Sequence, residues 1–162
     1  MSASTWLRTL AVVLALFTAG HTIGTAAPHV TRGADQAAVF AAMQAFHFQV
    51  MGFNRTYWEF YRGFALTISL LLLLMTCIAW QLGGLAQRFP RQTLPMAIAL
   101  QLACVGLLAL SWTFFFGGPI AISVVAVLSA TGAVRRLVRE GRSAARRVAD
   151  TPPHSMLADR LP

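Results

Sequence analysis

Residues 64–80 read Phe-Ala-Leu-Thr-Ile-Ser-Leu-Leu-Leu-Leu-Leu-Met-Thr-Cys-Ile-Ala-Trp, and no charged residue occurs between Arg62 and Arg88. A helix needs about 20 mostly apolar residues to cross the hydrocarbon core of a bilayer. The sequence therefore predicts a transmembrane helix over residues 60–85.

Further apolar runs of similar length predict three more spans. They cover residues 9–27, 94–116 and 119–134. The composition agrees, because 57% of the residues are hydrophobic and 11% are charged, against roughly 25% charged in soluble domains. We expect an all-α fold, an integral membrane four-helix bundle within residues 1–134. A basic tail, 135–162, should continue as a helix before a proline-containing end of about a dozen residues that is predicted to be disordered.

Arginine placement predicts the orientation, because short cytoplasmic loops retain positive charge. All 13 basic residues are arginine, against five acidic ones. One side of the membrane collects Arg8, Arg88, Arg91, Arg135, Arg136, Arg139, Arg142, Arg146 and Arg147. The other side holds Arg32, Arg55 and Arg62. We expect cytoplasmic termini, an outer loop over 28–59, membrane lipids as partners, and no nucleic-acid partner, since no nucleic-acid motif accompanies the arginines.

The outer loop contains a second apolar stretch, residues 37–53, with few polar interruptions. We expect a helix over about 36–52 that lies on the outer surface or between the spans. Reading this stretch as a fifth span is the competing topology, and it would place the basic tail outside.

The start of the chain has an alternative interpretation as a secretory signal, because Arg8, an apolar run and Thr25-Ala26-Ala27 resemble one. Pro28, directly after the would-be cleavage position, argues against it.

Candidate catalytic residues are His21, His47 and Glu59, since ionisable groups near a membrane are costly and suggest a function. As acids or bases they would have to meet in one site. Candidate ligand-binding residues follow the same segment: Gln49, Asn54, Arg55, Tyr57, Trp58, Tyr61 and Arg62.

Structural interpretations compete with these roles. The sequence Thr56-Tyr57-Trp58-Glu59 matches a capping box at a helix start. The aromatic residues around it fit an interfacial belt, and His21 fits a hydrogen bond to a neighbouring helix, a role also expected of Gln81 and Gln101.

No metal site or cofactor is expected. His21, His29, Asp35, His47 and Glu59 have no paired spacing typical of metal ligands. Cys77 and Cys104 each occur singly inside a predicted span, which is typical of packing residues.

The segment Gly52-Phe-Asn-Arg-Thr-Tyr-Trp-Glu-Phe-Tyr-Arg-Gly-Phe64, together with Gly20-His21-Thr22-Ile23-Gly24, resembles a family of uncharacterised small four-span bacterial membrane proteins. The resemblance covers residues 10–130 and implies the four-span fold and a bacterial inner-membrane location. It implies no activity. A likeness to DoxX-like four-helix membrane proteins concerns the layout alone.

Three functional hypotheses follow from the sequence. The first is a protein without enzymatic activity that binds a lipid or isoprenoid, or a membrane partner, which includes a second copy of the chain. The second is a membrane-embedded enzyme that uses His21, His47 and Glu59 in acid–base chemistry on an isoprenoid- or quinone-like substrate. A transporter is the weakest, because the spans carry almost no charge and no inverted repeat is visible.

Overall fold

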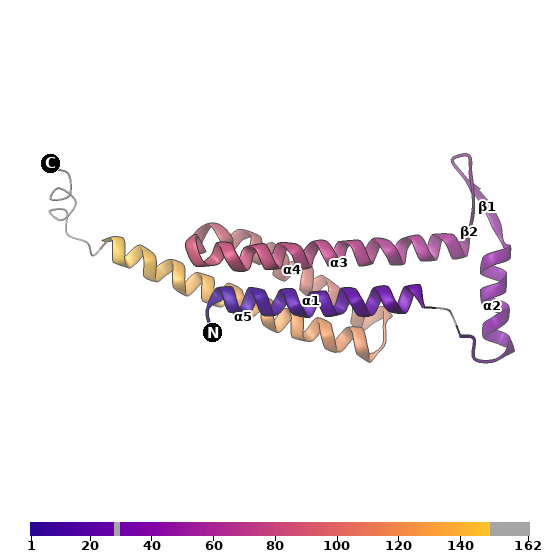
Figure 1. The fold of residues 1–162 in the computed structure, drawn as a ribbon, viewed down its shortest axis with the longest axis horizontal. Helices are drawn as coiled ribbons and strands as arrows, with labels where there is room; N and C mark the ends of the chain where they lie inside the picture. Colours follow the sequence, from indigo (N-terminus) through magenta and orange to yellow (C-terminus); the bar gives the residue numbers. More distant parts are fainter. Residues whose placement is uncertain (28–29, 150–162) are drawn as a thin grey trace. The chain divides into compact units, whose positions relative to one another are not determined.

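The computed structural model of the chain describes residues 1–27 and 30–149. Figure 1 shows the order of the elements over this part of the chain. They are α1 (Ala3–Ala26), α2 (Ala34–Ala45), β1 (His47–Val50), β2 (Phe53–Thr56), α3 (Tyr57–Arg88), α4 (Pro90–Phe114) and α5 (Gly117–Ala149). Within the described residues, α1, α3, α4 and α5 are each long and apolar enough to span a membrane. The expected all-α, four-span fold with one short additional helix is confirmed, and the chain is a multi-pass membrane protein.

The long helices begin earlier than the apolar runs that predict them, and α5 also ends much later. It continues through the arginines that follow residue 134 and ends at Ala149. Arginine is a good helix former, and its aliphatic stem can lie along apolar surface. The first part of the predicted basic tail is therefore helical, whereas the end predicted to be disordered lies outside the described residues.

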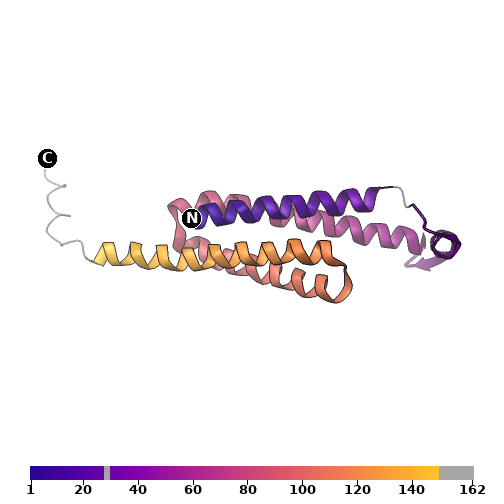
Figure 2. The ribbon, with the colours of Figure 1, turned by 90° about the horizontal axis from the view of Figure 1, so that it is seen from below.

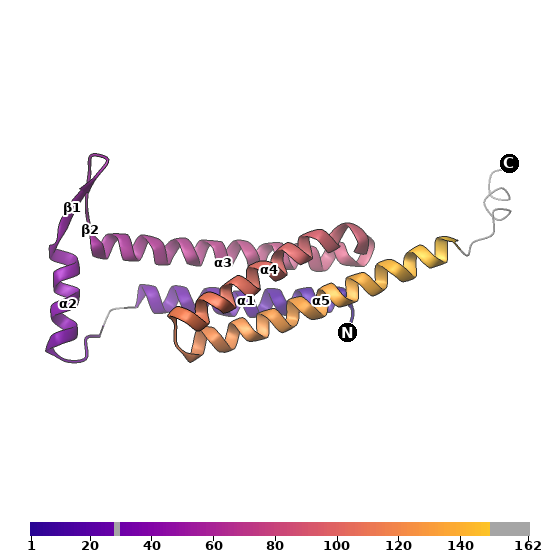
Figure 3. The ribbon, with the colours of Figure 1, turned by 180° about the vertical axis from the view of Figure 1, so that it is seen from behind.

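The chain divides into two compact units, and the first consists of Met1–Val13 and the chain from Met75 onward. Figures 2 and 3 show α4 and α5 of this unit side by side and antiparallel. Small residues are buried along these two helices: Ala97, Cys104, Ser111, Ser123, Ala126, Ser129, Ala130 and Ala133. Small side chains let helices approach closely, which gives van der Waals contact in a bilayer where the hydrophobic effect between helices is absent.

Polar side chains in this unit pair across helices. The Gln101 amide donates to Thr131 Oγ1 at 3.0 Å, which confirms the expected cross-helix role of this glutamine. Gln81 is exposed. The hydroxyls of Ser111 and Ser123 lie 3.2 Å apart between α4 and α5. Among the residues whose side chains are described, every buried polar side-chain atom has a hydrogen-bond partner.

The second unit, Leu14–Leu74, contains the end of α1, α2, the two strands and the start of α3. Figure 1 shows α2 lying across the direction of α1 and α3 instead of alongside them. No residue of α2 is buried. Of the two placements expected for this helix, the one between the spans is therefore not observed.

The predicted helix over residues 36–52 is wrong in its second half. The helix ends at Ala45, and the next residues form an antiparallel hairpin in which His47 pairs with Thr56 and Val50 with Phe53. Its turn is Met51-Gly52, and both residues have positive φ, 49° and 85°. Two-residue hairpin loops favour such turns because their twist matches that of the strands. The apolar stretch 37–53 thus contains a helix and a strand, each too short to span a bilayer.

Candidate functional site

The start of α3 is held by the predicted capping box. The backbone N–H of Thr56 donates to Glu59 Oε2 at 2.8 Å, and the N–H of Glu59 donates to Thr56 Oγ1 at 3.1 Å. These reciprocal bonds satisfy two backbone donors that a helix start leaves unpaired. The capping interpretation of Glu59 is therefore confirmed, and one of its carboxylate oxygens is engaged in the fold.

Aromatic rings attach the hairpin to α3. The Phe48 ring lies 4.9 Å from the Tyr57 ring and 5.5 Å from the Phe60 ring, centroid to centroid. Phe60 lies 5.3 Å from Phe64 in an edge-to-face arrangement. Such geometries are favourable for aromatic pairs. The contacts of Phe48 fix the strand β1 against the first turn of α3.

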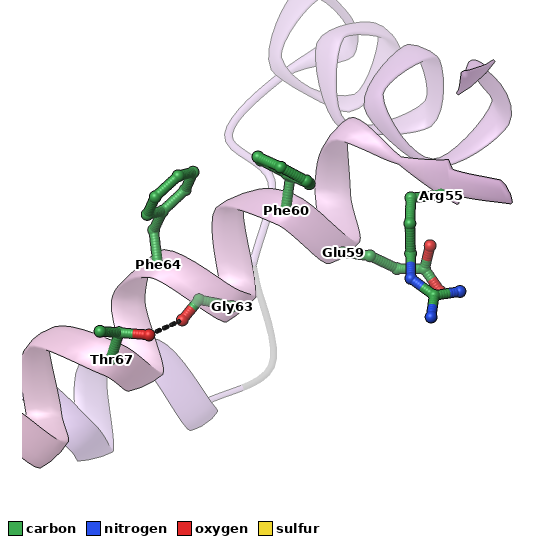
Figure 4. A pocket seen from close by; sticks show the side chains of 6 residues that line it. All are labelled: Arg55, Glu59, Phe60, Gly63, Phe64 and Thr67. Atoms are coloured by element: carbon green, nitrogen blue, oxygen red, sulfur yellow. Dashed lines mark hydrogen bonds between the residues drawn. The ribbon is translucent and has the colours of Figure 1, made fainter. Parts of the chain in front are cut away.

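A groove lies on the flank of α3 beside the hairpin, and we call it the α3 groove. It is lined by Arg55, Glu59, Phe60, Gly63, Phe64 and Thr67 and has a volume of about 340 Å³. Figure 4 shows Arg55 and Glu59 together at one end, with the two phenyl rings farther along the helix.

The four-residue spacing of the lining residues explains the shape of the groove. Glu59, Gly63 and Thr67 form one row along α3, and Phe60 and Phe64 form a second row beside it. Gly63 has no side chain, and space is open around the position that a Cβ would take. Thr67 Oγ1 donates to the Gly63 carbonyl at 2.9 Å, so its hydroxyl is already satisfied. The groove is therefore apolar along its length and charged at one end.

Of the predicted ligand-binding residues, Arg55 is the one that lines the α3 groove. Gln49 and Asn54 are exposed and face each other as a pair in the hairpin. Trp58 stacks on Tyr61 at 5.6 Å, and Tyr57 stacks on Phe46 at 5.5 Å. Arg62 is exposed. The sequence analysis missed the groove residues Phe60, Gly63, Phe64 and Thr67. Their spacing along one helix predicts that they align, but it does not predict that a groove forms there.

His21 is held by another helix. Its Nδ1 lies 3.0 Å from Ser69 Oγ of α3, and Thr22 Oγ1 donates to the same serine oxygen at 3.0 Å. The three polar side chains thus satisfy one another at the contact between α1 and α3. The expected hydrogen bond from His21 to a neighbouring helix is confirmed.

The three candidate catalytic residues have different surroundings. His21 pairs with Ser69, Glu59 caps α3, and His47 is an exposed residue of β1. His21 and His47 do not line the α3 groove that Glu59 borders. Within the described part of the chain, no group of three or more histidine, cysteine or acidic residues could hold a metal ion. His29, the other histidine considered as a ligand, lies outside the described residues.

Removal of the Ser69 hydroxyl tests the contact between α1 and α3. We expect Ser69→Ala to lower the free energy of unfolding by about 0.6–1.7 kcal/mol, the range of hydrogen bonds between transmembrane helices. The measurement is denaturation of the purified protein in bicelles. Thr113→Ala is the control, because that exposed hydroxyl donates to the Ala109 carbonyl of its own helix. Equal losses in both variants would contradict a cross-helix contribution.

Comparisons of the chain with protein families, with curated proteins and with solved structures find no match. The resemblance to small four-span bacterial membrane proteins therefore stays a prediction.

Proposed function

We propose that this protein binds a lipid- or isoprenoid-like molecule in the α3 groove and has no enzymatic activity of its own. We place it in a bacterial inner membrane with both termini in the cytoplasm, so that the α3 groove faces the outer leaflet. The observation that carries the proposal is the gradient of polarity along the groove. It has two charged side chains at one end and two phenyl rings along the helix.

The charges at the end of the groove indicate what kind of head group would fit. Arg55 supplies a guanidinium, and Glu59 supplies a carboxylate whose Oε2 is used in the helix cap. Opposite charges side by side suit a polar or zwitterionic group that both donates and accepts hydrogen bonds. The phenyl rings of Phe60 and Phe64 offer flat apolar surface to a hydrocarbon or isoprenoid chain.

The hydrogen-bond partners of the ionisable side chains favour a binding role over a catalytic one. A general acid–base pair must reach the same reacting atoms. His21 and Glu59 are each engaged with a hydroxyl or backbone group of the fold, at Ser69 and Thr56 respectively. A membrane partner, including a second copy of the chain, is the competing occupant of the same groove, and the experiment below distinguishes the two.

The test is native mass spectrometry with lipid analysis on protein purified gently from its own membrane. We expect the parent to carry an apolar molecule, and we expect Phe64→Ala to lower its occupancy about tenfold, since burial of a phenylalanine side chain contributes about 1.5–3 kcal/mol. Arg55→Gln should also lower it, by loss of a charged hydrogen bond.

Two control variants separate the groove from the rest of the surface. Phe114→Ala removes an equally large ring from α4 that is 74% exposed, and His47→Ala removes a polar side chain of the hairpin outside the groove. Both should leave the occupancy unchanged. Three results would contradict the proposal. The parent protein could carry no apolar molecule, or it could carry a copurified protein instead. Phe64→Ala and Phe114→Ala could also lower the occupancy equally.

A further inference from the structure

A second groove lies between α4 and α5, and we call it the α4–α5 groove. It is lined by Arg91 and Leu94 of α4 and by Leu137, Val138, Gly141 and Arg142 of α5, and its volume is about 210 Å³. Leu137 is 1% exposed, and Leu94 and Val138 are half-buried. The floor of this groove is therefore apolar, and its polar lining consists of two guanidinium groups.

Gly141 determines how Arg91 lies over α5. A Cβ at Gly141 would come within 3.1 Å of Arg91 Cγ. The absence of a side chain thus lets the aliphatic stem of Arg91 cross close to the backbone of α5. This close approach keeps the guanidinium of α4 on the same groove as that of Arg142.

The charge around the α4–α5 groove is almost entirely positive. Between residues 75 and 143 the sequence contains one acidic residue, Glu140, and these arginines: Arg88, Arg91, Arg135, Arg136, Arg139 and Arg142. Glu140 is engaged elsewhere, because its Oε1 accepts the backbone N–H of Ala3 at the start of α1 at 3.1 Å. The α3 groove combines an arginine with a carboxylate, whereas the α4–α5 groove has arginine alone.

We propose that the α4–α5 groove binds the phosphate of an anionic phospholipid. Guanidinium groups bind phosphate oxygens with paired hydrogen bonds, and basic pockets between transmembrane helices accept anionic head groups. The volume is too small for a whole lipid, so the groove takes the phosphate and the adjoining glycerol. The apolar floor of Leu94, Leu137 and Val138 contacts the first carbons of the chains, which continue into the bilayer.

The test is the retention of lipid by the purified full chain after reconstitution into nanodiscs of phosphatidylcholine with phosphatidylglycerol, read by native mass spectrometry. We expect phosphatidylglycerol to be retained in preference to phosphatidylcholine. Arg91→Gln and Arg142→Gln should each lower this retention about tenfold, as expected for the loss of a hydrogen bond between charged groups. Arg91→Lys should retain an intermediate amount, because it keeps the charge and loses the paired geometry.

The matched control is Arg135→Gln, which removes the same charge from α5 at an exposed position outside the groove. It should leave retention nearly unchanged. A second variant, Gly141→Ala, keeps every charge and should weaken retention by displacing Arg91. An equal loss in Arg135→Gln and Arg142→Gln would overturn the proposal in favour of general surface charge. Complete displacement of the lipid by millimolar inorganic phosphate would overturn it in favour of a soluble anion.

Discussion

Substitution of Gly132 by alanine is expected to lower the free energy of unfolding by about 1–3 kcal/mol, the usual cost of overpacking. Gly132 of α5 lies against the indole of Trp6 in α1. A Cβ at this position would be 2.6 Å from Trp6 Cδ2 and less than 3 Å from two further ring atoms. The ring itself is rigid, so either the whole indole must rotate out of its position or the two helices must separate, and both lose packing contacts.

The matched control for this substitution is Gly106→Ala in α4. Apart from the nearby backbone of its own helix, no atom of the described residues lies within 4 Å of the position that its Cβ would take, so the added methyl group meets open space. Alanine is a better helix former than glycine by about 1 kcal/mol, and we expect this variant to be as stable as the parent or more stable. Thermal denaturation of both variants in the same detergent makes the comparison. A Gly132→Ala variant as stable as Gly106→Ala would contradict close packing of Trp6 on α5.

Removal of the positive charge after the fourth span is expected to change the orientation of the protein. The combined variant Arg135→Gln, Arg136→Gln, Arg139→Gln and Arg142→Gln should place the end of α5 on the outer side in a large fraction of molecules. Each arginine near the inner surface contributes about 1 kcal/mol through the anionic lipids of that leaflet, and arginine bias sets the topology of short loops. The measurement is labelling of a cysteine at position 143 with a membrane-impermeant reagent.

The control for the orientation is removal of arginines from the other side of the membrane. The combined variant Arg32→Gln, Arg55→Gln and Arg62→Gln should keep the tail inside, because it increases the charge difference between the two sides. An equal change of orientation in both combined variants would contradict the prediction, because it would mean that the number of arginines, and not their position, affects insertion.

The spans could be predicted from the sequence, because an uninterrupted apolar run of about 20 residues fits few structures other than a transmembrane helix. The capping box at Thr56 and Glu59 could also be predicted, since both partners lie within one turn. The prediction of a helix over 36–52 was wrong in its second half, because the apolar residues of this stretch fit a helix and a strand equally well. The turn at Met51-Gly52 has positive φ at both positions, which does not fit a helix and forms a hairpin.

The grooves could not be predicted from the apolar pattern. Phe60 and Phe64 look like ordinary span residues until the hairpin places Arg55 beside them. Arg91 and Arg142 are 51 residues apart in the numbering, and only the packing of α4 on α5 brings them to one groove. The partner of His21 was likewise hidden, because Ser69 is 48 positions away and its contact depends on how α1 and α3 pack.

The proposed placement of the α3 groove in the outer leaflet depends on four spans with both termini inside. The direct test labels single cysteines in intact cells, in a background in which Cys77 and Cys104 are replaced by alanine. Met51→Cys reports on the hairpin turn, where the side chain is 95% exposed, and Ser143→Cys reports on α5 at an exposed position after the fourth span. We predict that an impermeant maleimide labels Met51→Cys in intact cells and labels Ser143→Cys only after the membrane is permeabilised. Labelling of Ser143→Cys in intact cells would contradict the four-span topology with an inner tail.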